Sequence, residues 1–461
     1  MMLDVARGCS RYRFLYRRPL AAGAEKSRVS ARASRSELRS AHCRLEHPDP
    51  RQSIEACAGL ELRSAHRFGH RHQMPGRLGA PLGTLLLLLQ SAGAWHEEFR
   101  LSAYVNIEHG PWFPEYKTGN VDWARVAQRA TDLILYSVEP SSDGGVVHVP
   151  HVPPEVLEAA RLAREHHPGV RLHVCVGGPG KSAAFGPVVI NLSVRRSLIK
   201  ELVRLAVDED LDGIDFAWDG DVNPSLDSGY AQLMTELKEA AAKAEDFTKK
   251  ELVVTMMVQP GEEHPQAYGA ADYIHLMSYD NCTKVPCQHS TYENAQANVQ
   301  EMLALGAEPS KLVLGIPAYA REKNDPEEVR SYNEILRDGG PVPLDQDEVS
   351  PEKHRTMREH MEQHVGKTWY FNSVGTVVKK AEYAVQQGLA GVYVWEAGQD
   401  ASIRSYSLMA ALGDVKKRKK YDRDRQAEMD EEKKRKNEAA RLKAKKKKEQ
   451  ARKRARPRGD L

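Results

Sequence analysis

The sequence predicts an α/β protein built on a (β/α)8 TIM barrel, with basic extensions at both ends. Between Phe99 and Leu412, short apolar runs alternate with stretches of helical period, which is the pattern of parallel strands separated by helices. Eight such runs fit into about 310 residues, a length that suits one eight-stranded barrel. A doubly wound open sheet is the alternative, but no Gly-x-Gly-x-x-Gly sequence follows the first run.

The predicted strands are the apolar runs themselves, at residues 99–106, 132–138, 171–178, 212–218, 251–258, 272–279, 312–318 and 390–396. Amphipathic segments between them predict helices at residues 154–166, 193–209, 228–245 and 292–305. The longest interval between runs, 319–389, holds an acidic stretch at 324–367. We expect this stretch to be a loop-rich elaboration of the barrel rather than a second domain.

Charge divides the chain into three segments. The 461 residues carry 67 Lys+Arg and 64 Asp+Glu. Residues 1–73 have 15 basic and 7 acidic side chains (+8), residues 74–415 have 30 and 48 (−18), and residues 416–461 have 22 and 9 (+13). A 41% hydrophobic content supports a folded core, and six cysteines exclude a disulfide-dense scaffold. We assign the predicted barrel to residues 95–415, within the acidic segment.

The N-terminal region predicts two segments that precede the barrel. Residues 1–73 are rich in Arg, Ala and Ser without a sustained apolar period, which predicts a disordered or spurious extension, with a transit peptide as the alternative. Residues 74–94 combine a basic start, a leucine run and small residues ending at Ala94, the pattern of a signal peptide. They predict the secretory pathway, with an extracellular, lysosomal or vacuolar destination. The apolar run is too short to span a bilayer, so we expect no transmembrane segment.

The basic C-terminal segment, residues 416–461, is composed almost entirely of Lys, Arg, Glu, Ala and Gln. A helix of this composition is polar on every side and has no face to bury. The composition therefore predicts a solvated, partly helical tail. The functional alternative is an arm that binds a polyanion, such as nucleic acid, anionic lipid or an acidic glycan.

The fourth predicted strand carries the candidate chemistry, in the sequence Asp212-Gly-Ile-Asp-Phe-Ala-Trp-Asp219. Side chains alternate along a strand, so Asp215, Ala217 and Asp219 are expected to share the face toward the barrel interior. The apolar alternates are expected to face the helices: Ile214, Phe216 and Trp218. Carboxylates are costly to bury without partners, and barrel enzymes place their sites at the carboxyl ends of the strands.

This stretch resembles the signature Asp-x-x-Asp-x-Asp-x-Glu of glycoside hydrolase family 18, the chitinases, chitobiases and chitinase-like lectins. Four further stretches resemble family motifs on the expected strands: Gly177-Gly178, Met277-Ser-Tyr-Asp280, Gly315-Ile-Pro-Ala-Tyr319 followed by Arg321, and Gly391-Val-Tyr-Val-Trp-Glu396. The resemblance covers roughly residues 99–412. Each motif is weak alone, but five in the right order identify the family well.

The resemblance implies hydrolysis of β-1,4-linked N-acetylglucosamine glycans by substrate-assisted catalysis, an exception to the two-carboxylate scheme. An acid protonates the glycosidic oxygen, and the acetamido oxygen of the substrate attacks the anomeric carbon. Carried over, the catalytic positions are Asp219 as the acid, Asp215, and Tyr279, which holds the acetamido oxygen. The substrate-binding positions are Asp280, Trp395 as the apolar floor under the sugar, Met277, Tyr104, Tyr319 and Arg321. No metal or cofactor is implied.

Three positions of the implied network depart from the family. The acid is Asp219 rather than Glu, so its carboxyl is set back by about one C–C bond from the oxygen that it must reach. The middle Asp is Ala217, which has no charge to stabilise an oxazolinium ion. The Ser before Gly-Gly is Cys175, a weak donor. We therefore expect a chitin-type glycan-binding protein with lost or weak hydrolysis.

The same residues leave two alternatives. One is an active hydrolase in which Asp219 acts through a water or a shifted strand, or in which another strand-end acid supplies the proton: Glu108, Glu139 or Glu396. The other is an interaction protein whose barrel is only structural.

Smaller motifs predict covalent features. Cys282 and Cys287 flank Thr-Lys-Val-Pro after the sixth run and predict a local disulfide. Asn191-Leu-Ser and Asn281-Cys-Thr are N-glycosylation sequons. The 18 histidines show no metal-ligand spacing, and we expect them on the surface.

Overall fold

A computed structural model of the chain describes residues 99–107, 121–146, 152–220, 223–244, 251–282, 284–339, 342–350 and 367–454. The extension predicted at residues 1–73 and the signal peptide predicted at residues 74–94 lie outside the described residues. So does Glu108, one of the alternative acids.

Eight parallel strands close into a barrel, which confirms the predicted fold class. They are β1 (Arg100–Asn106), β2 (Asp132–Val138), β3 (Arg171–Gly177), β4 (Gly213–Ala217), β5 (Val253–Val258), β6 (Tyr273–Leu276), β7 (Leu312–Pro317) and β12 (Gly391–Trp395). Around the barrel the order is β1-β12-β7-β6-β5-β4-β3-β2. Each predicted strand coincides with one of these, because strands covered on both faces read as continuous apolar runs.

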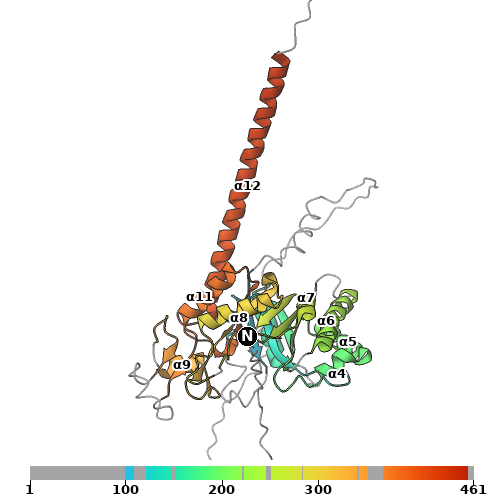
Figure 1. Ribbon diagram of the computed structural model, residues 1–461, viewed down its shortest axis with the longest axis vertical. Helices are drawn as coiled ribbons and strands as arrows, with labels where there is room; N and C mark the ends of the chain where they lie inside the picture. The colour runs from blue at the N-terminus through green and yellow to red at the C-terminus, as the bar shows by residue number, and fades with distance from the viewer. Residues whose placement is uncertain are drawn as a thin grey trace, which may run out of the picture. The chain divides into compact units, whose positions relative to one another are not determined.

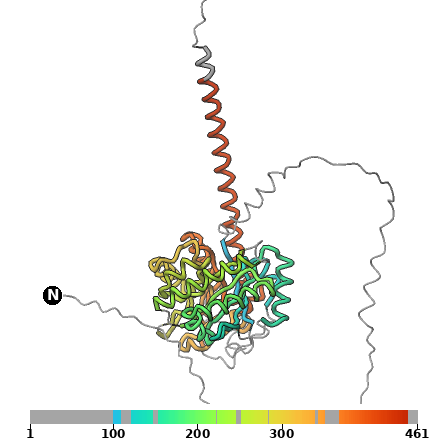
Figure 2. Tube along the Cα trace, turned by 90° about the vertical axis from the view of Figure 1, so that its right-hand side faces the viewer, coloured from blue at the N-terminus to red at the C-terminus, as the bar shows by residue number. Residues whose placement is uncertain are grey.

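Helices surround the outside of the strands (Figures 1 and 2). They are α2 (Trp123–Ala127), α3 (Pro154–His166), α4 (Phe185–Ile190), α5 (Leu192–Asp208), α6 (Pro224–Lys243), α7 (Pro265–Ala270), α8 (Tyr292–Ala304) and α11 (Val374–Gln386), with 3-10 turns η4 (Pro309–Lys311) and η5 (Ala397–Gln399). The larger hydrophobic core lies between strands and helices and includes Ile214 and Phe216. A second cluster fills the barrel interior.

Polar residues fix where several of these helices begin. The side chains of Asn191, Asn223, Thr291 and Ser373 accept hydrogen bonds from the first free backbone N–H groups of α5, α6, α8 and α11. Such caps stabilise a helix by about 1 kcal/mol each. Asn223 and Thr291 follow the loops that leave β4 and β6, so these two caps also fix where α6 and α8 begin to pack against the barrel.

The interval between β7 and α11 adds a second sheet. It contains β8 (Tyr319–Glu322), β9 (Val329–Ser331), β10 (Glu348–Val349) and β11 (Trp369–Tyr370), antiparallel in the order β10-β11-β8-β9, together with α9 (Tyr332–Gly339). Within the stretch predicted to be loop-rich, 324–367, the described residues contain β9, α9 and the two-residue β10. These short strands were not predicted, because two or three residues are too few to show a period of two.

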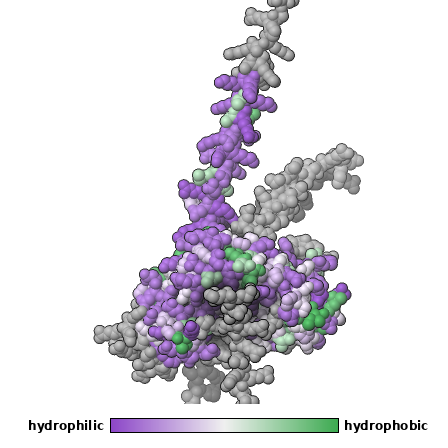
Figure 3. All heavy atoms as spheres, viewed as in Figure 1, coloured by the Kyte–Doolittle hydropathy of each residue, from purple (hydrophilic) through white to green (hydrophobic). Residues whose placement is uncertain are grey.

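The C-terminal helix α12 (Leu408–Arg454) is continuous over 47 residues. Its first turns are held against the barrel by buried side chains that include Leu408, Leu412 and Val415. From residue 421 to 448 every side chain is exposed, and Figure 3 shows this helix as hydrophilic on the visible face. The segment is thus more helical than its composition predicts. None of the helices in the described ranges is long and apolar enough to span a membrane.

A buried charge cluster closes the end of the barrel where the strands begin. Arg100 on β1 pairs with Asp132 on β2, which also lies 3.0 Å from Arg171 Nε and 3.2 Å from His173 Nε2. Burial alone would raise the pKa of the Asp132 carboxyl, but the two guanidinium groups outweigh it and hold the pKa well below its usual range. The charges at this end therefore serve the fold, since barrel sites lie at the opposite end.

Candidate functional site

An aromatic wall lines the barrel interior near the carboxyl ends of β1, β2 and β12. Trp395 lies edge-on to Tyr136, with ring centroids 4.7 Å apart, and its centroid is 5.3 Å from that of Tyr104. Tyr104 also contacts Tyr393, at 5.2 Å. Tyr104 and Tyr393 are fully buried, whereas Trp395 and Tyr136 are partly exposed. The exposed edge of the wall therefore offers two aromatic side chains to a ligand.

Tyr136 is a site residue that the sequence analysis missed. It lies on β2 at an interior position, above the turn at Gly177 and Gly178. Both glycines have positive φ, and a Cβ on Gly178 would lie 1.8 Å from the Tyr136 hydroxyl. Both positions favour glycine, because only glycine adopts this conformation readily. Gly178 leaves room for the tyrosine, whereas a Cβ on Gly177 would lie 2.5 Å from the Ala217 carbonyl oxygen.

Asp215 lies at the centre of a buried polar network. It accepts hydrogen bonds from Tyr104 Oη (2.9 Å) and Thr255 Oγ1 (2.5 Å), and His275 Nδ1 lies 3.5 Å from its Oδ1. Burial alone would raise the pKa of this carboxyl, but the hydrogen bond and charge of His275, with further hydrogen bonds from Thr255 and Cys175, hold it below the usual value. Asp215 is thus an ionised, fully occupied carboxylate that positions its neighbours.

His275 and Thr255 were not predicted, and His275 contradicts the expectation that the histidines lie on the surface. His275 is 1% exposed, on β6, and lies 2.5 Å from Tyr104 Oη. His173, His264 and His289 are buried too. An available signal was the strand period: His275 stands two residues before Met277 and four before Tyr279, at alternating positions along the sixth run.

Strand β4 ends at Ala217, and Asp219 lies two residues beyond that end. The alternation of strand side chains therefore does not fix its direction, and the expectation that it shares a face with Asp215 stays a prediction. Its backbone N–H donates to Ser182 Oγ (2.9 Å), which anchors the loop. Trp218, the residue between Ala217 and Asp219, stacks on Phe185 of α4 with ring centroids 5.2 Å apart, so it faces the helices as expected.

The Asp219 carboxyl is partly exposed and has a raised pKa. Burial is the main cause, and the negative charge of Glu262, in the loop after β5, adds to it. A carboxyl that keeps its proton nearer to neutral pH is suited to general acid catalysis. Glu262 was also missed, because nothing in the sequence links two loops 43 residues apart.

Position 217 has no charge in this structure. Ala217 lies in the interior cluster with Cys175 and stands in register with Met257 on the neighbouring strand β5. Cys175 is buried and is not in a disulfide. The space beside Asp215 is therefore bounded by apolar side chains where the family motif has a carboxylate.

Tyr279 and Met277 follow β6 and join the same interior cluster. Tyr279 is 8% exposed, and its hydroxyl lies 3.0 Å from that of Tyr393. Burial raises the pKa of Tyr279 well above its usual value, so the hydroxyl stays protonated. It can donate one hydrogen bond to a ligand or to Tyr393.

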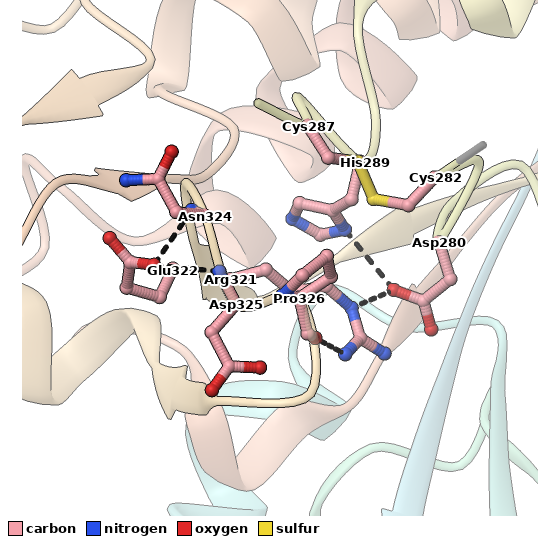
Figure 4. The surroundings of a disulfide bond; sticks show 9 residues. All are labelled: Asp280, Cys282, Cys287, His289, Arg321, Glu322, Asn324, Asp325 and Pro326. Atoms are coloured by element: carbon pink, nitrogen blue, oxygen red, sulfur yellow. Dashed lines mark hydrogen bonds and ion pairs between the residues drawn. A yellow bond between two sulfur atoms is a disulfide. The ribbon is translucent and has the colours of Figure 1, made fainter. Parts of the chain in front are cut away.

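Asp280 belongs to a charged group beside this cluster, shown in Figure 4. Its carboxylate pairs with Arg321 on β8 and lies 3.3 Å from His289 Nδ1. Burial would raise the pKa of Asp280, but the hydrogen bonds from His289 and Arg321 hold it far below the usual value. Tyr319 lies against His289, with ring centroids 5.1 Å apart. Asp280 is thus a fixed anion.

The disulfide between Cys282 and Cys287 closes the loop between Asp280 and His289. The backbone N–H of Asn281 donates to the carbonyl of His289 (3.0 Å), and that of Cys287 donates to the carbonyl of Lys323 (3.0 Å). The crosslinked loop is therefore tied both to itself and to the added sheet, which fixes His289 beside Asp280.

Two further acids were alternatives for proton donation. Glu396 is buried directly after Trp395, and its Oε2 accepts from the backbone N–H groups of Gly398 (3.3 Å) and Asn106 (3.4 Å). It caps η5 and has a structural role there. Glu139 is partly exposed after β2. Within the described ranges no group of three or more His, Cys, Asp or Glu side chains is placed to hold a metal ion.

Comparison with known proteins finds a known family for this chain. A family model described as glycosyl hydrolases family 18 matches residues 113–400, more than half of the chain. The Drosophila melanogaster protein named probable chitinase 2 is 22% identical over 292 residues, covering 51% of this chain and 57% of its own. Mouse chitotriosidase-1 is 25% identical over 272 residues, covering 50% and 58%. The chain thus spans less than two thirds of these relatives.

Solved structures share the fold. The Cycas revoluta chitinase in complex with (GlcNAc)3 has a TM-score of 0.54 and 19% identity, covering 69% of this chain and 98% of the other. YKL-39, solved in the presence of chitooligosaccharides, has a TM-score of 0.55 and 17% identity, covering 69% and 99%. Identities this low show the fold alone.

Proposed function

The chain belongs to the glycosyl hydrolases of family 18, and on that premise we propose that it is a chitinase-like protein that binds β-1,4-linked N-acetylglucosamine glycans and hydrolyses them weakly or not at all. The observation that carries the proposal is the contrast within one site. The aromatic and hydrogen-bonding groups around Trp395 and Tyr279 are in place, whereas position 217 is apolar.

The binding part of the proposal is supported by the partly exposed Trp395, Tyr136 and Met277 at the mouth of the interior cluster. Aromatic faces provide the large apolar contact on which a pyranose ring stacks. Tyr279 and the fixed anion Asp280 supply polar contacts beside that wall. Two similar structures were solved with (GlcNAc)3 or in the presence of chitooligosaccharides, which agrees with this ligand class.

The weak hydrolysis is argued from the charges that surround the reacting carbon. Substrate-assisted cleavage develops positive charge on the oxazolinium ring, and Ala217 offers no counter-charge. The remaining carboxylate of the strand, Asp215, stands two residues before position 217, and hydrogen bonds from Tyr104 and Thr255 hold it within the buried network. Loss of one preorganised stabilising group costs about 10²–10³ in rate.

An active glycosidase is the second candidate, and one observation favours it. Asp219 has a raised pKa, so it retains the property that a proton donor needs although its side chain is shorter than Glu. In that case Asp219 protonates the leaving oxygen directly or through one water. Asp219→Asn, which keeps the shape and removes the proton, separates the two candidates.

The experiment is a titration with chitotetraose by calorimetry, with product release followed in the same sample. We expect saturable binding with little product. Absence of binding to any N-acetylglucosamine oligomer contradicts the proposal. Rapid product release that Asp219→Asn abolishes favours the active glycosidase.

We also propose that the distal part of α12 binds a polyanion. Residues 433–448 comprise ten Lys or Arg and a single acid, Glu438, and all are exposed. Since the helix has no apolar face there, electrostatic attraction is its available binding force. Deleting residues 433–461 should shift elution from a dextran sulfate column to lower salt. An unchanged elution position contradicts the proposal.

Entry into the secretory pathway is proposed from the pattern at residues 74–94 alone. Sequencing the N-terminus of protein from its native source tests it directly.

A further inference from the structure

The two sequons lie in different surroundings. Asn191 stands between α4 and α5, and Asn191, Leu192 and Ser193 are all exposed. Asn281 lies between Asp280 and the disulfide-bonded Cys282, in the loop that closes the charged group of the site. Because a glycan is attached through the side-chain amide nitrogen, the environment of that atom decides which sequon accepts one.

The amide nitrogen of Asn281 is buried, and within the described part of the chain nothing accepts a hydrogen bond from it. The backbone N–H of Asn281 donates to the carbonyl of His289 (3.0 Å), and the next residue is crosslinked to Cys287. A sugar on this nitrogen requires the loop to move away from His289 and Asp280. The folded site therefore excludes a glycan at Asn281.

Asn191 can carry a glycan without losing its structural role. Its Oδ1 accepts from the backbone N–H groups of Ser193 (2.9 Å) and Val194 (3.3 Å) and so caps α5. This cap uses the oxygen, whereas glycosylation uses Nδ2. The modified side chain keeps the same acceptor, so the cap survives.

The residues beside Asn191 give a second reason to expect a glycan there. Ile190 is 71% exposed and Leu192 is 45% exposed. Figure 3 shows a hydrophobic area on the side of the molecule that carries α4 and α5. Exposed apolar patches are a liability unless something covers them. A large hydrophilic oligosaccharide on the residue between these two side chains would shield them.

We propose that Asn191 carries an N-linked oligosaccharide and that Asn281 does not. In the reaction, Nδ2 of Asn191 forms a bond to the anomeric carbon of the first sugar and loses one proton. The donor is a lipid-pyrophosphate-linked oligosaccharide, whose pyrophosphate leaves with the electron pair. The proposal rests on the proposed entry into the secretory pathway but not on the proposed glycan ligand.

The test is expression of the full chain in a eukaryotic secretory host, followed by intact mass measurement before and after enzymatic release of N-glycans. Ser193→Ala destroys the sequon and keeps the capping Asn191, whereas Ser193→Thr keeps the sequon and is the matched control. We expect one releasable glycan on wild type and Ser193→Thr, none on Ser193→Ala, and no change on Thr283→Ala.

Any of three results overturns the proposal. They are a glycan at Asn281, a Ser193→Ala protein that still loses the wild-type glycan mass on enzymatic release, and a wild-type chain without any releasable glycan. Chitotetraose binding is measured on the same samples, and we expect it to be equal for wild type and Ser193→Ala. If neither wild type nor Ser193→Ala binds chitotetraose while wild type carries the glycan, the proposed function is contradicted and the glycan assignment still holds.

Discussion

Replacing Lys380 by methionine should remove a pH dependence of stability above neutral pH. Lys380 lies on α11 with its side chain fully buried, and its ammonium donates to Ser290 O (3.0 Å), Ser290 Oγ (2.7 Å) and Asn372 Oδ1 (2.8 Å). None of these acceptors is charged. Burial lowers the pKa of Lys380 from 10.5 to about 7, although the charges of Asp347 and Glu293 oppose the change.

The size of the effect follows from that pKa. The gap between 10.5 and about 7 corresponds to about 5 kcal/mol, at roughly 1.4 kcal/mol for each pKa unit. In this interval the unfolded chain binds the proton and the folded chain does not, so the free energy of unfolding rises with pH. Below pH 7 Lys380 is protonated in both the folded and the unfolded chain, and its buried charge destabilises the folded chain by the full amount. Between pH 7 and 9 the contribution of Lys380 should rise by about 2 kcal/mol.

The assay is urea unfolding of wild type and Lys380→Met at pH 6, 7, 8 and 9, followed by tryptophan fluorescence. Methionine matches the aliphatic stem but removes the hydrogen bonds that the ammonium donates, so that Ser290 O keeps only the bond from Asn372 Nδ2 (2.6 Å). This adds a loss that does not vary with pH. Lys379→Met, at the exposed neighbouring position on α11, is the control and should track wild type. A difference between wild type and Lys380→Met that stays constant from pH 7 to 9 refutes the reasoning.

Three further outcomes are expected. Trp395→Ala should weaken binding of chito-oligomers by about 1–3 kcal/mol in a calorimetric titration, because the stacking face is lost; equal affinities contradict the aromatic wall. Ala217→Asp and Asp219→Glu should each restore little hydrolysis, while the double variant should exceed the product of their effects by at least about tenfold, because counter-charge and acid act as one unit; simple multiplication of the two rates argues against a joint network. N-terminal sequencing should place the mature start between about Ala92 and Phe99, as a signal peptide requires; a chain that keeps residues 1–73 argues against secretion.

The sequence predicts the barrel well because its strands are covered on both faces. Their apolar runs are local signals, and residues 253–258 or 312–317 need no distant partner to be recognised. The paired strands β10 and β11 were missed because two residues show no period.

The polar network of the site was much less accessible. Tyr104 and Asp215 are 111 residues apart, and Asp215 and Thr255 are 40 apart. A buried His275 or Lys380 is acceptable only because such distant partners satisfy it, and the chain does not reveal those partners locally. The motif residues were found by resemblance, whereas the groups that set their charge were found only in three dimensions.

The most direct test of the weak-hydrolysis claim is the turnover number of the wild-type chain on a chromogenic chitotriose, measured at saturation by the same glycan. The account predicts saturable binding with turnover below about 1 s⁻¹, the lower end of the ordinary range, since one stabilising group is worth about 10²–10³ in rate. Turnover in the range of about 1–10³ s⁻¹, abolished by Asp219→Asn, would contradict it.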